Sequence, residues 1–138
     1  MLQYPARIEA DGDRFMASFR DIPEALTGAD TWEQTQKLAA EALLTAMDFY
    51  FEDGRAVPPA SAPEEGEVLV SLPASVEAKI LVLNEMVAQH VTQSELARKM
   101  GTTKQEVTRI VDLHHATKID TLAQALGALG RQLRISVV

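Results

Sequence analysis

Apolar and polar residues alternate in two short stretches near the start of the chain. Residues 4–10 and 15–19 place an apolar side chain at every second position, and Asp11, Gly12 and Asp13 stand between the two stretches. A period of two is typical of a strand with one buried face, and a glycine flanked by aspartates is typical of a tight turn. The pattern therefore predicts a β-hairpin with one buried face.

A long helix and a further strand are expected after the hairpin. Thr31 and Gln34 have the spacing of a capping box, which predicts a helix start at this threonine. Gly54 ends the helical run, and residues 67–72 alternate again, as expected for an edge strand. The helix has a wide apolar face suited to lying across a sheet, formed by Leu38, Ala39, Ala42, Leu43, Ala46, Met47, Phe49 and Tyr50. This half of the chain is predicted to be a small α+β layer.

Helical periodicity dominates the second half of the chain. Pro73 suits the first turn of a helix, and apolar residues recur three and four positions apart from residue 76 to residue 87. Thr92, Thr103 and Thr117 each stand three positions before an acidic residue. Because this is the spacing of a helix cap, short helices are expected to begin near residues 93, 104 and 118.

Residues 93–111 have the pattern of a helix-turn-helix. Gly101 suits the turn, small Ala97 lets two helices approach each other, and the larger apolar residues expected to face inward are Leu96, Met100, Val107 and Ile110. A glycine between two helices is a weak signal by itself. Five buried positions at the correct intervals, together with two capping boxes, make the pattern specific.

The outward positions of this motif carry side chains that read DNA. Glutamine pairs with adenine, arginine or lysine with guanine, and threonine with a phosphate or a thymine methyl group. Gln93, at the start of the first helix, is expected to hold a phosphate. The candidate DNA-binding residues are Gln93, Thr102, Thr103, Lys104, Gln105, Thr108 and Arg109. The alternative is that they form an ordinary solvated helix face.

The end of the chain predicts an unpaired strand. Residues 131–138 alternate apolar and polar side chains, yet no neighbouring segment is suited to pair with them. Pairing with the same strand of a second copy across a two-fold axis would satisfy the exposed backbone groups, so a dimer is expected. Two-fold symmetry would also place two recognition helices about one DNA turn apart, on an inverted-repeat operator. The alternative is pairing with the sheet of the front half.

Charge divides the chain into the same two halves. The 138 residues carry a net charge of −7. Residues 1–72 hold 5 basic and 14 acidic side chains, whereas residues 73–138 hold 8 basic and 6 acidic ones. A proline-rich loop over residues 54–66 precedes the boundary. We therefore expect two domains, 1–72 and 73–138, of which the first attracts a cationic protein and the second approaches a polyanion.

Several functional classes are disfavoured. The chain has no cysteine, which excludes disulfides and cysteine-based zinc sites, and it has neither a signal pattern nor an apolar stretch of membrane length, so a cytoplasmic location without membrane attachment is expected. A metal-dependent nuclease would need converging carboxylates. The pairs Asp11 with Asp13 and Asp48 with Glu52 are more typical of solubility, so no catalytic residue, metal or cofactor is expected.

Three motifs give the chain a family resemblance. They are the segment FRDIPEALT at residues 19–27, the alanine-rich helix ending at a DGRAVP loop at residues 53–58, and the string HHATKID at residues 114–120. With the QSELARKMGTTKQEVTRIV segment, they make nearly the whole chain resemble the HicB antitoxins that have a helix-turn-helix tail. The tail itself resembles the helix-turn-helix domains of phage repressors.

The resemblance implies both a fold and partners. It implies an α+β chain with a partial RNase H-like β-β-(β)-α-β front domain, followed by an all-α helix-turn-helix domain with a C-terminal strand. The front domain would neutralise a HicA-like toxin, a small basic protein that cleaves RNA, and the tail would repress the operon encoding both. Candidate toxin contacts are Asp21, Glu24, Asp48, Glu52 and Asp53. Alternatives are a repressor whose front domain senses a small molecule and a metal-dependent RNA hydrolase.

Overall fold

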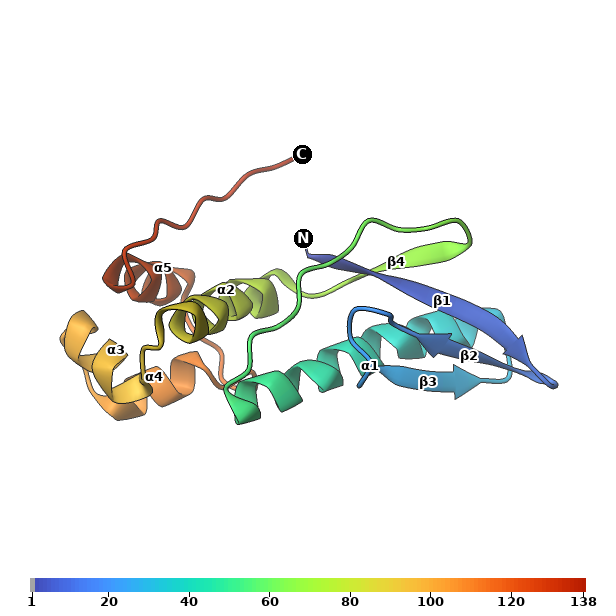
Figure 1. Ribbon diagram of the computed structural model, residues 1–138, viewed down its shortest axis with the longest axis horizontal. Coiled ribbons are helices and arrows are strands. Elements are labelled where there is room, and N and C mark those ends of the chain that lie inside the picture. Colours follow the sequence, from blue (N-terminus) through green and yellow to red (C-terminus); the bar gives the residue numbers. More distant parts are fainter. Residues whose placement is uncertain (1) are drawn as a thin grey trace. The chain divides into compact units, whose positions relative to one another are not determined.

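The computed structural model describes residues 2–138, which form two compact units (Figure 1). Unit 1 comprises the chain up to Tyr50 together with Pro58–Ala74, and unit 2 comprises Phe51–Val57 and Ser75–Val138. The fold is α+β, as predicted. Its elements are β1 (Gln3–Asp11), β2 (Arg14–Ser18), β3 (Leu26–Ala29), α1 (Trp32–Asp53), β4 (Glu67–Ser71), α2 (Ala74–Gln89), α3 (Gln93–Met100), α4 (Lys104–Ile110) and α5 (Ile119–Ala128).

The sheet of unit 1 has the strand order β3-β2-β1-β4, and every neighbouring pair is antiparallel. The predicted hairpin is confirmed, because Asp11 pairs with Arg14 and leaves a two-residue turn. Gly12 adopts a φ of 63° there, which a residue with a side chain rarely adopts. The third strand, which stands in parentheses in the element order implied by the resemblance, is present as β3. The predicted edge strand is β4.

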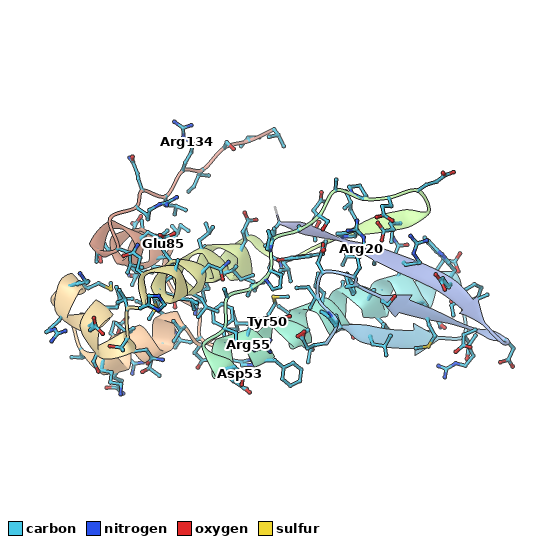
Figure 2. The ribbon with its side chains drawn as sticks, in the orientation of Figure 1. Arg20, Tyr50, Asp53, Arg55, Glu85 and Arg134 are labelled. Carbon is cyan, nitrogen blue, oxygen red and sulfur yellow. The ribbon has the colours of Figure 1, made fainter. Side chains whose placement is uncertain are left out.

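The core of unit 1 is narrower than the sequence pattern predicts. Tyr4, Ala6 and Ala17 of the sheet are buried, whereas Ala10 near the hairpin tip is exposed. The buried stripe of α1 ends at Tyr50 (Figure 2) and comprises Thr35, Ala39, Leu43, Ala46, Met47 and Tyr50. The remaining apolar residues of the predicted wide face, Leu38, Ala42 and Phe49, are only partly covered. An apolar strip of α1 therefore faces outward.

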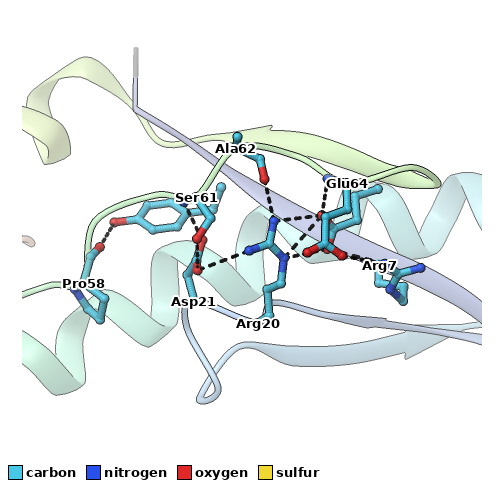
Figure 3. Close-up of polar contacts among 9 residues, drawn as sticks. Arg7, Arg20, Asp21, Pro58, Ser61, Ala62 and Glu64 are labelled. Carbon is cyan, nitrogen blue, oxygen red and sulfur yellow. Dashed lines mark hydrogen bonds and ion pairs between the residues drawn. The ribbon is translucent and has the colours of Figure 1, made fainter.

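Side chains of the sheet and of the following turn hold the proline-rich loop in place (Figure 3). Arg20 donates from Nε and Nη2 to the Glu67 carboxylate, at 3.0 Å each, and from Nη2 to the Ala62 carbonyl at 2.6 Å. Asp21 accepts from the amide and the hydroxyl of Ser61 at 2.8 and 2.6 Å. The loop is thus tied to the sheet by charge-assisted hydrogen bonds as well as stiffened by prolines.

Acid is expected to weaken unit 1 through Glu67. The hydrogen bonds from Arg20, and after them the one from the Glu64 amide, hold the pKa of Glu67 below its usual value of 4.5. A lowered carboxyl pKa contributes stability that is present above pH 4.5 and is lost as the pH falls through the folded-state pKa. Glu67→Gln should therefore be less stable than the parent chain at neutral pH, and the deficit should shrink in acid. Urea unfolding of both chains, followed by circular dichroism at neutral pH and in acid, measures this difference in stability.

Glu65→Gln is the matched control for this experiment. Glu65 is exposed and lies two residues away, so its substitution removes the same charge from the same loop. Its effect on unfolding should be small at both pH values. A Glu67→Gln deficit that is equal in acid and at neutral pH would contradict the role of the ionised carboxylate.

Unit 2 packs four helices around one apolar core. The expected helix starts near residues 93, 104 and 118 are confirmed by α3, α4 and α5. The expected threonine cap of α5 is wrong, because Lys118 is its N-cap residue and makes no side-chain cap hydrogen bond. The buried cluster is formed by Ala78, Val82, Met86, Leu96, Ala97, Val107, Ile110, Leu122, Ala125, Leu126 and Leu129. It contains the predicted inward residues of the helix-turn-helix, with Met100 partly buried against it.

The end of the chain does not form the predicted strand in this single copy. Residues 131–138 have no strand assignment, and the four-stranded sheet does not include them, so the alternative of pairing with the front sheet is wrong. Ile135 and Val137 are 74% and 97% exposed. A strand requires a hydrogen-bonded neighbour, and residues 2–138 of one copy supply none for this segment.

Candidate functional site

Helix α3 has well-formed ends that fix it within the helix-turn-helix. The Thr92 hydroxyl accepts from the Glu95 amide at 3.1 Å, and the Glu95 carboxylate accepts from the Thr92 amide at 3.4 Å, which completes the predicted capping box. Gly101 ends the helix with a φ of 70°. The next amide, of Thr102, donates back to the Ala97 carbonyl at 2.9 Å, as in a Schellman motif. Glycine is required at this turn because of its left-handed conformation.

Helix α4 follows immediately and presents most of the candidate DNA-binding residues. The Thr103 hydroxyl caps it by accepting from the Glu106 amide at 3.2 Å. Val107 and Ile110 are fully buried and hold its inner face against the core. The exposed candidates on the turn and on the outer face are Thr102, Thr103, Lys104, Gln105, Thr108 and Arg109.

Two of the candidates lie together at the meeting of the two helices. The Thr108 hydroxyl is 2.9 Å from Gln93 Oε1 and 3.0 Å from the Lys104 carbonyl oxygen. Gln93, which is half-buried, stands at the first position of α3. The structure thus brings the expected phosphate contact beside the expected base-reading helix.

Arg109 is held by a surface ion pair. Its Nη1 lies 3.5 Å from Glu106 Oε2, one helical turn away, and the Arg109 side chain is 47% exposed. Exposed ion pairs of this kind contribute little stability. The guanidinium is therefore available to exchange Glu106 for another acceptor, such as a guanine edge.

Lys79, which the sequence pattern did not single out, supports α4 from its buried side. Lys79 is 3% exposed, and its Nζ donates to the carbonyls of Arg109, Asp112 and His115 at 3.1, 2.6 and 2.6 Å. Burial lowers the pKa of Lys79, while the Asp112 carboxylate acts in the opposite direction. Three carbonyl acceptors match the three donors of the ammonium group. The signal was its spacing, since Lys79 stands three residues after Val76 and four before Leu83 on the buried stripe of α2.

The five candidate toxin contacts are not equivalent. Asp21 is 11% exposed at its side chain and holds Ser61, and Glu24 accepts from the Tyr50 hydroxyl at 2.6 Å. Asp53 pairs with Arg55 at 3.1 Å (Figure 2) and, like Glu52, is exposed. Asp21, Glu24 and Asp48 belong to unit 1, whereas Glu52 and Asp53 belong to unit 2. Asp48 and Glu52 lie one helical turn apart on α1, whereas Asp21 and Glu24 are held by hydrogen bonds within unit 1.

Unit 1 also has a groove, which lies where β3 and the preceding turn face α1. Its volume is about 240 Å³. It is lined by Glu24, Leu26, Thr27, Leu38, Glu41, Ala42, Thr45, Ala46 and Phe49. Of the earlier candidates only Glu24 lies on it. The outward apolar strip of α1 forms one wall.

A larger pocket, of about 400 Å³, lies in unit 2. It is lined mostly by apolar side chains of α2 and of the residues around it: Phe51, Gly54, Leu83, Met86, Val87, His90, Val91, Thr92, Gln93 and Val111. A sensing site would be expected to have convergent polar groups in the front half of the chain. Most of the lining of this pocket is apolar, and most of it comes from residues 83–111 of the second half of the chain.

Within residues 2–138, His, Asp and Glu side chains form no group of three that would hold a metal ion. No helix of this part of the chain is both long and apolar enough to cross a membrane.

Comparison with known proteins adds an independent result. Residues 3–81 match the family of HicB-like antitoxins of bacterial toxin–antitoxin systems. The chain is 49% identical over 137 residues to Antitoxin HicB 2 of Photorhabdus laumondii subsp. laumondii, covering 99% of this chain and 97% of that protein. It is 44% identical over 138 residues to Antitoxin HicB of Escherichia coli K12, covering 99% and 100%. The corresponding protein of Pseudomonas fluorescens Pf0-1 is 33% identical, covering 99% and 94%.

Proposed function

This chain belongs to the HicB-like antitoxins of bacterial toxin–antitoxin systems, and on that basis we propose that it neutralises a HicA-like toxin and represses its own operon. The family consists of antitoxins rather than enzymes, so no catalytic residue is assigned. Unit 1 binds the toxin, a small basic RNA-cleaving protein, and unit 2 binds operator DNA. The element order β-β-β-α-β of unit 1 agrees with the expected partial RNase H-like fold. Both partners belong to the cytoplasm, where the complex acts.

The observation that supports DNA binding is the outer face of α4. A capped helix-turn-helix presents threonine, lysine and glutamine side chains at the exposed positions 102–105 and threonine and arginine at the exposed positions 108 and 109, with Gln93 beside Thr108. These side chains match the contacts that such helices make with base edges and phosphates in the major groove. Residues 73–138 carry 8 basic against 6 acidic side chains, so this half approaches a polyanion more readily than the front half.

Arg109→Ala is expected to weaken operator binding by about 1–3 kcal/mol and to relax the preference at one base pair, because a bidentate arginine–guanine contact is lost. Gln93→Ala is the control, since a phosphate contact carries no sequence information and its loss should weaken binding to all sequences alike. Fluorescence anisotropy with the operator and with single-base variants measures both. Equal loss on every sequence for Arg109→Ala would contradict base reading.

Operator affinity should also fall steeply as the salt concentration rises, because phosphate contacts release counterions from the DNA.

The operator-bound form is proposed to be a homodimer on an inverted repeat. The support is the end of the chain, where alternating apolar side chains are exposed and the backbone lacks a strand partner within residues 2–138 of one copy. Pairing of two such segments across a two-fold axis would satisfy their backbone groups and bury Ile135 and Val137. The same axis would set the spacing of two α4 helices on DNA.

Toxin neutralisation is tested by co-expression with a HicA-like protein, to be sought in the neighbouring reading frame as a small basic chain. The expected result is growth arrest by that protein alone and recovery when this chain is produced with it. The support is charge, because residues 1–72 hold 14 acidic and 5 basic side chains, and such a surface steers a cationic partner toward it. Failure to bind that protein, or to restore growth, would overturn the proposed function.

A further inference from the structure

Part of the apolar face of α1 is left uncovered in unit 1. Leu43 and Met47 are buried, whereas Leu38 and Ala42 are half-buried and Phe49 is 48% exposed. The uncovered positions are spaced by four and seven residues, so they follow one side of the helix. Exposed aromatic side chains such as this one are enriched at protein interfaces relative to the rest of the surface.

The opposite wall of the same groove is a free sheet edge. Strand β3 is the last strand in the order β3-β2-β1-β4 and pairs only with β2 within residues 2–138. Its first residue, Leu26, lines the groove and is 61% exposed. An unpaired edge offers backbone donors and acceptors to a strand of another chain.

The rim of the groove is acidic. Glu24 and Glu41 both line it, and none of its lining residues is a lysine or an arginine. The Tyr50 hydroxyl donates to Glu24 at 2.6 Å and orients that carboxylate. Negative charge around an apolar floor is complementary to a partner segment in which basic side chains flank an apolar one.

We propose that this groove is the docking surface for the toxin and that its occupant is an extended basic segment of that protein. The segment adds to the free edge of β3 and places an apolar side chain against Leu26 and Phe49, while its basic side chains face Glu24 and Glu41. A groove of about 240 Å³ holds one or two side chains, so it is the centre of the interface rather than the whole of it. This inference rests on the proposed function, because it requires that the toxin binds unit 1.

The test compares two arginine substitutions in the full-length chain. Phe49→Arg places a cation in the groove, and Leu69→Arg places one on β4, at the other end of the sheet order. The two sites are matched, since Phe49 is 48% and Leu69 is 42% exposed. Toxin affinity, measured by calorimetry, should fall by at least about 30-fold for Phe49→Arg, as expected at an interface hot spot, and by less than about threefold for Leu69→Arg.

Hydrogen exchange gives a second measurement that does not depend on a substitution. Toxin binding should slow exchange of amides in residues 26–29, because an added strand protects the edge. Both variants should bind operator DNA as the parent does, which controls for folding.

The results of these measurements distinguish a failure of the docking groove from a failure of the proposed function. No binding of the toxin by the parent chain would remove the proposed function itself. Binding by the parent chain with equal affinities of the two variants, and no protection at residues 26–29, would overturn the groove while leaving the function intact. A halved mass of Phe49→Arg in light scattering would identify the groove as a contact between copies of this chain and would also overturn the docking proposal.

Discussion

Lys79→Met is expected to reduce operator affinity by at least about tenfold without changing toxin affinity. The methionine keeps most of the apolar stem in the core but removes the ammonium group that holds the carbonyls of Arg109, Asp112 and His115. The Arg109 carbonyl is near the end of α4, so loss of this donor frees the end of the helix that carries the proposed guanine-reading side chain. Hydrogen bonds to a charged group contribute about 1.5–3 kcal/mol each, which makes this one of the largest effects of a single substitution in unit 2.

Lys118→Met is the matched control. Lys118 is exposed in the same unit, so its substitution removes the same positive charge from the surroundings of the DNA without removing the three hydrogen bonds. Fluorescence anisotropy with operator DNA and calorimetry with the toxin are measured for both variants. If the two lysine substitutions weaken operator binding equally, the effect of Lys79 is one of net charge, and its role in positioning α4 is refuted.

Truncation after Arg134 is expected to convert the proposed dimer into a monomer and to weaken operator binding by at least about a hundredfold. The deletion removes Ile135, Val137 and Val138, all of them exposed, and it leaves the Arg131–Glu85 ion pair and the partly buried Leu133 in place. The fold of unit 2 should therefore persist. Binding to two half-sites through one linked pair of domains gains about 10² to 10⁴ over a single domain, and a monomer forfeits that gain.

Light scattering and salt dependence check this result independently. A monomer makes half the phosphate contacts of a dimer, so the slope of log affinity against log salt concentration should also fall by about half. Val138→Ser, which alters the terminal side chain and keeps the backbone, serves as the control. An unchanged mass of the truncated chain would show that the C-terminal segment does not pair the two copies.

Much of the local structure could be predicted from the sequence because its signals act over three or four residues. The starts of α1, α3 and α4 were predicted from threonines whose hydroxyls do accept first-turn amides at residues 34, 95 and 106. The hairpin turn at Gly12 and the helix stop at Gly101 were predicted from conformations that glycine favours. The one misplaced cap, at Thr117, has the same spacing, but the chain enters α5 one residue later.

The candidate site was predicted unevenly for the same reason. The exposed face of α4 could be assigned because its inner positions, Val107 and Ile110, define the outer ones by helical geometry. The acidic residues of the front half had no such pattern of buried neighbours to indicate their surroundings. Asp21 is 40 residues from Ser61, and Glu24 is 26 residues from Tyr50, so their hydrogen bonds could not be seen in any local pattern.

By itself the sequence determined the α+β class, the helix-turn-helix and the contrast of charge between the halves, because periodicity, caps and composition are properties of neighbouring residues. Only the tertiary structure decided that Lys79 holds carbonyls 30 to 36 residues away and that the apolar face of α1 is wider than its cover. It likewise decided that residues 131–138 do not join the sheet of the front half, an alternative that the sequence left open. These features depend on which distant surfaces meet. The free energy of that packing is shared among many side chains that are distant in sequence, so no single stretch of the chain determines it.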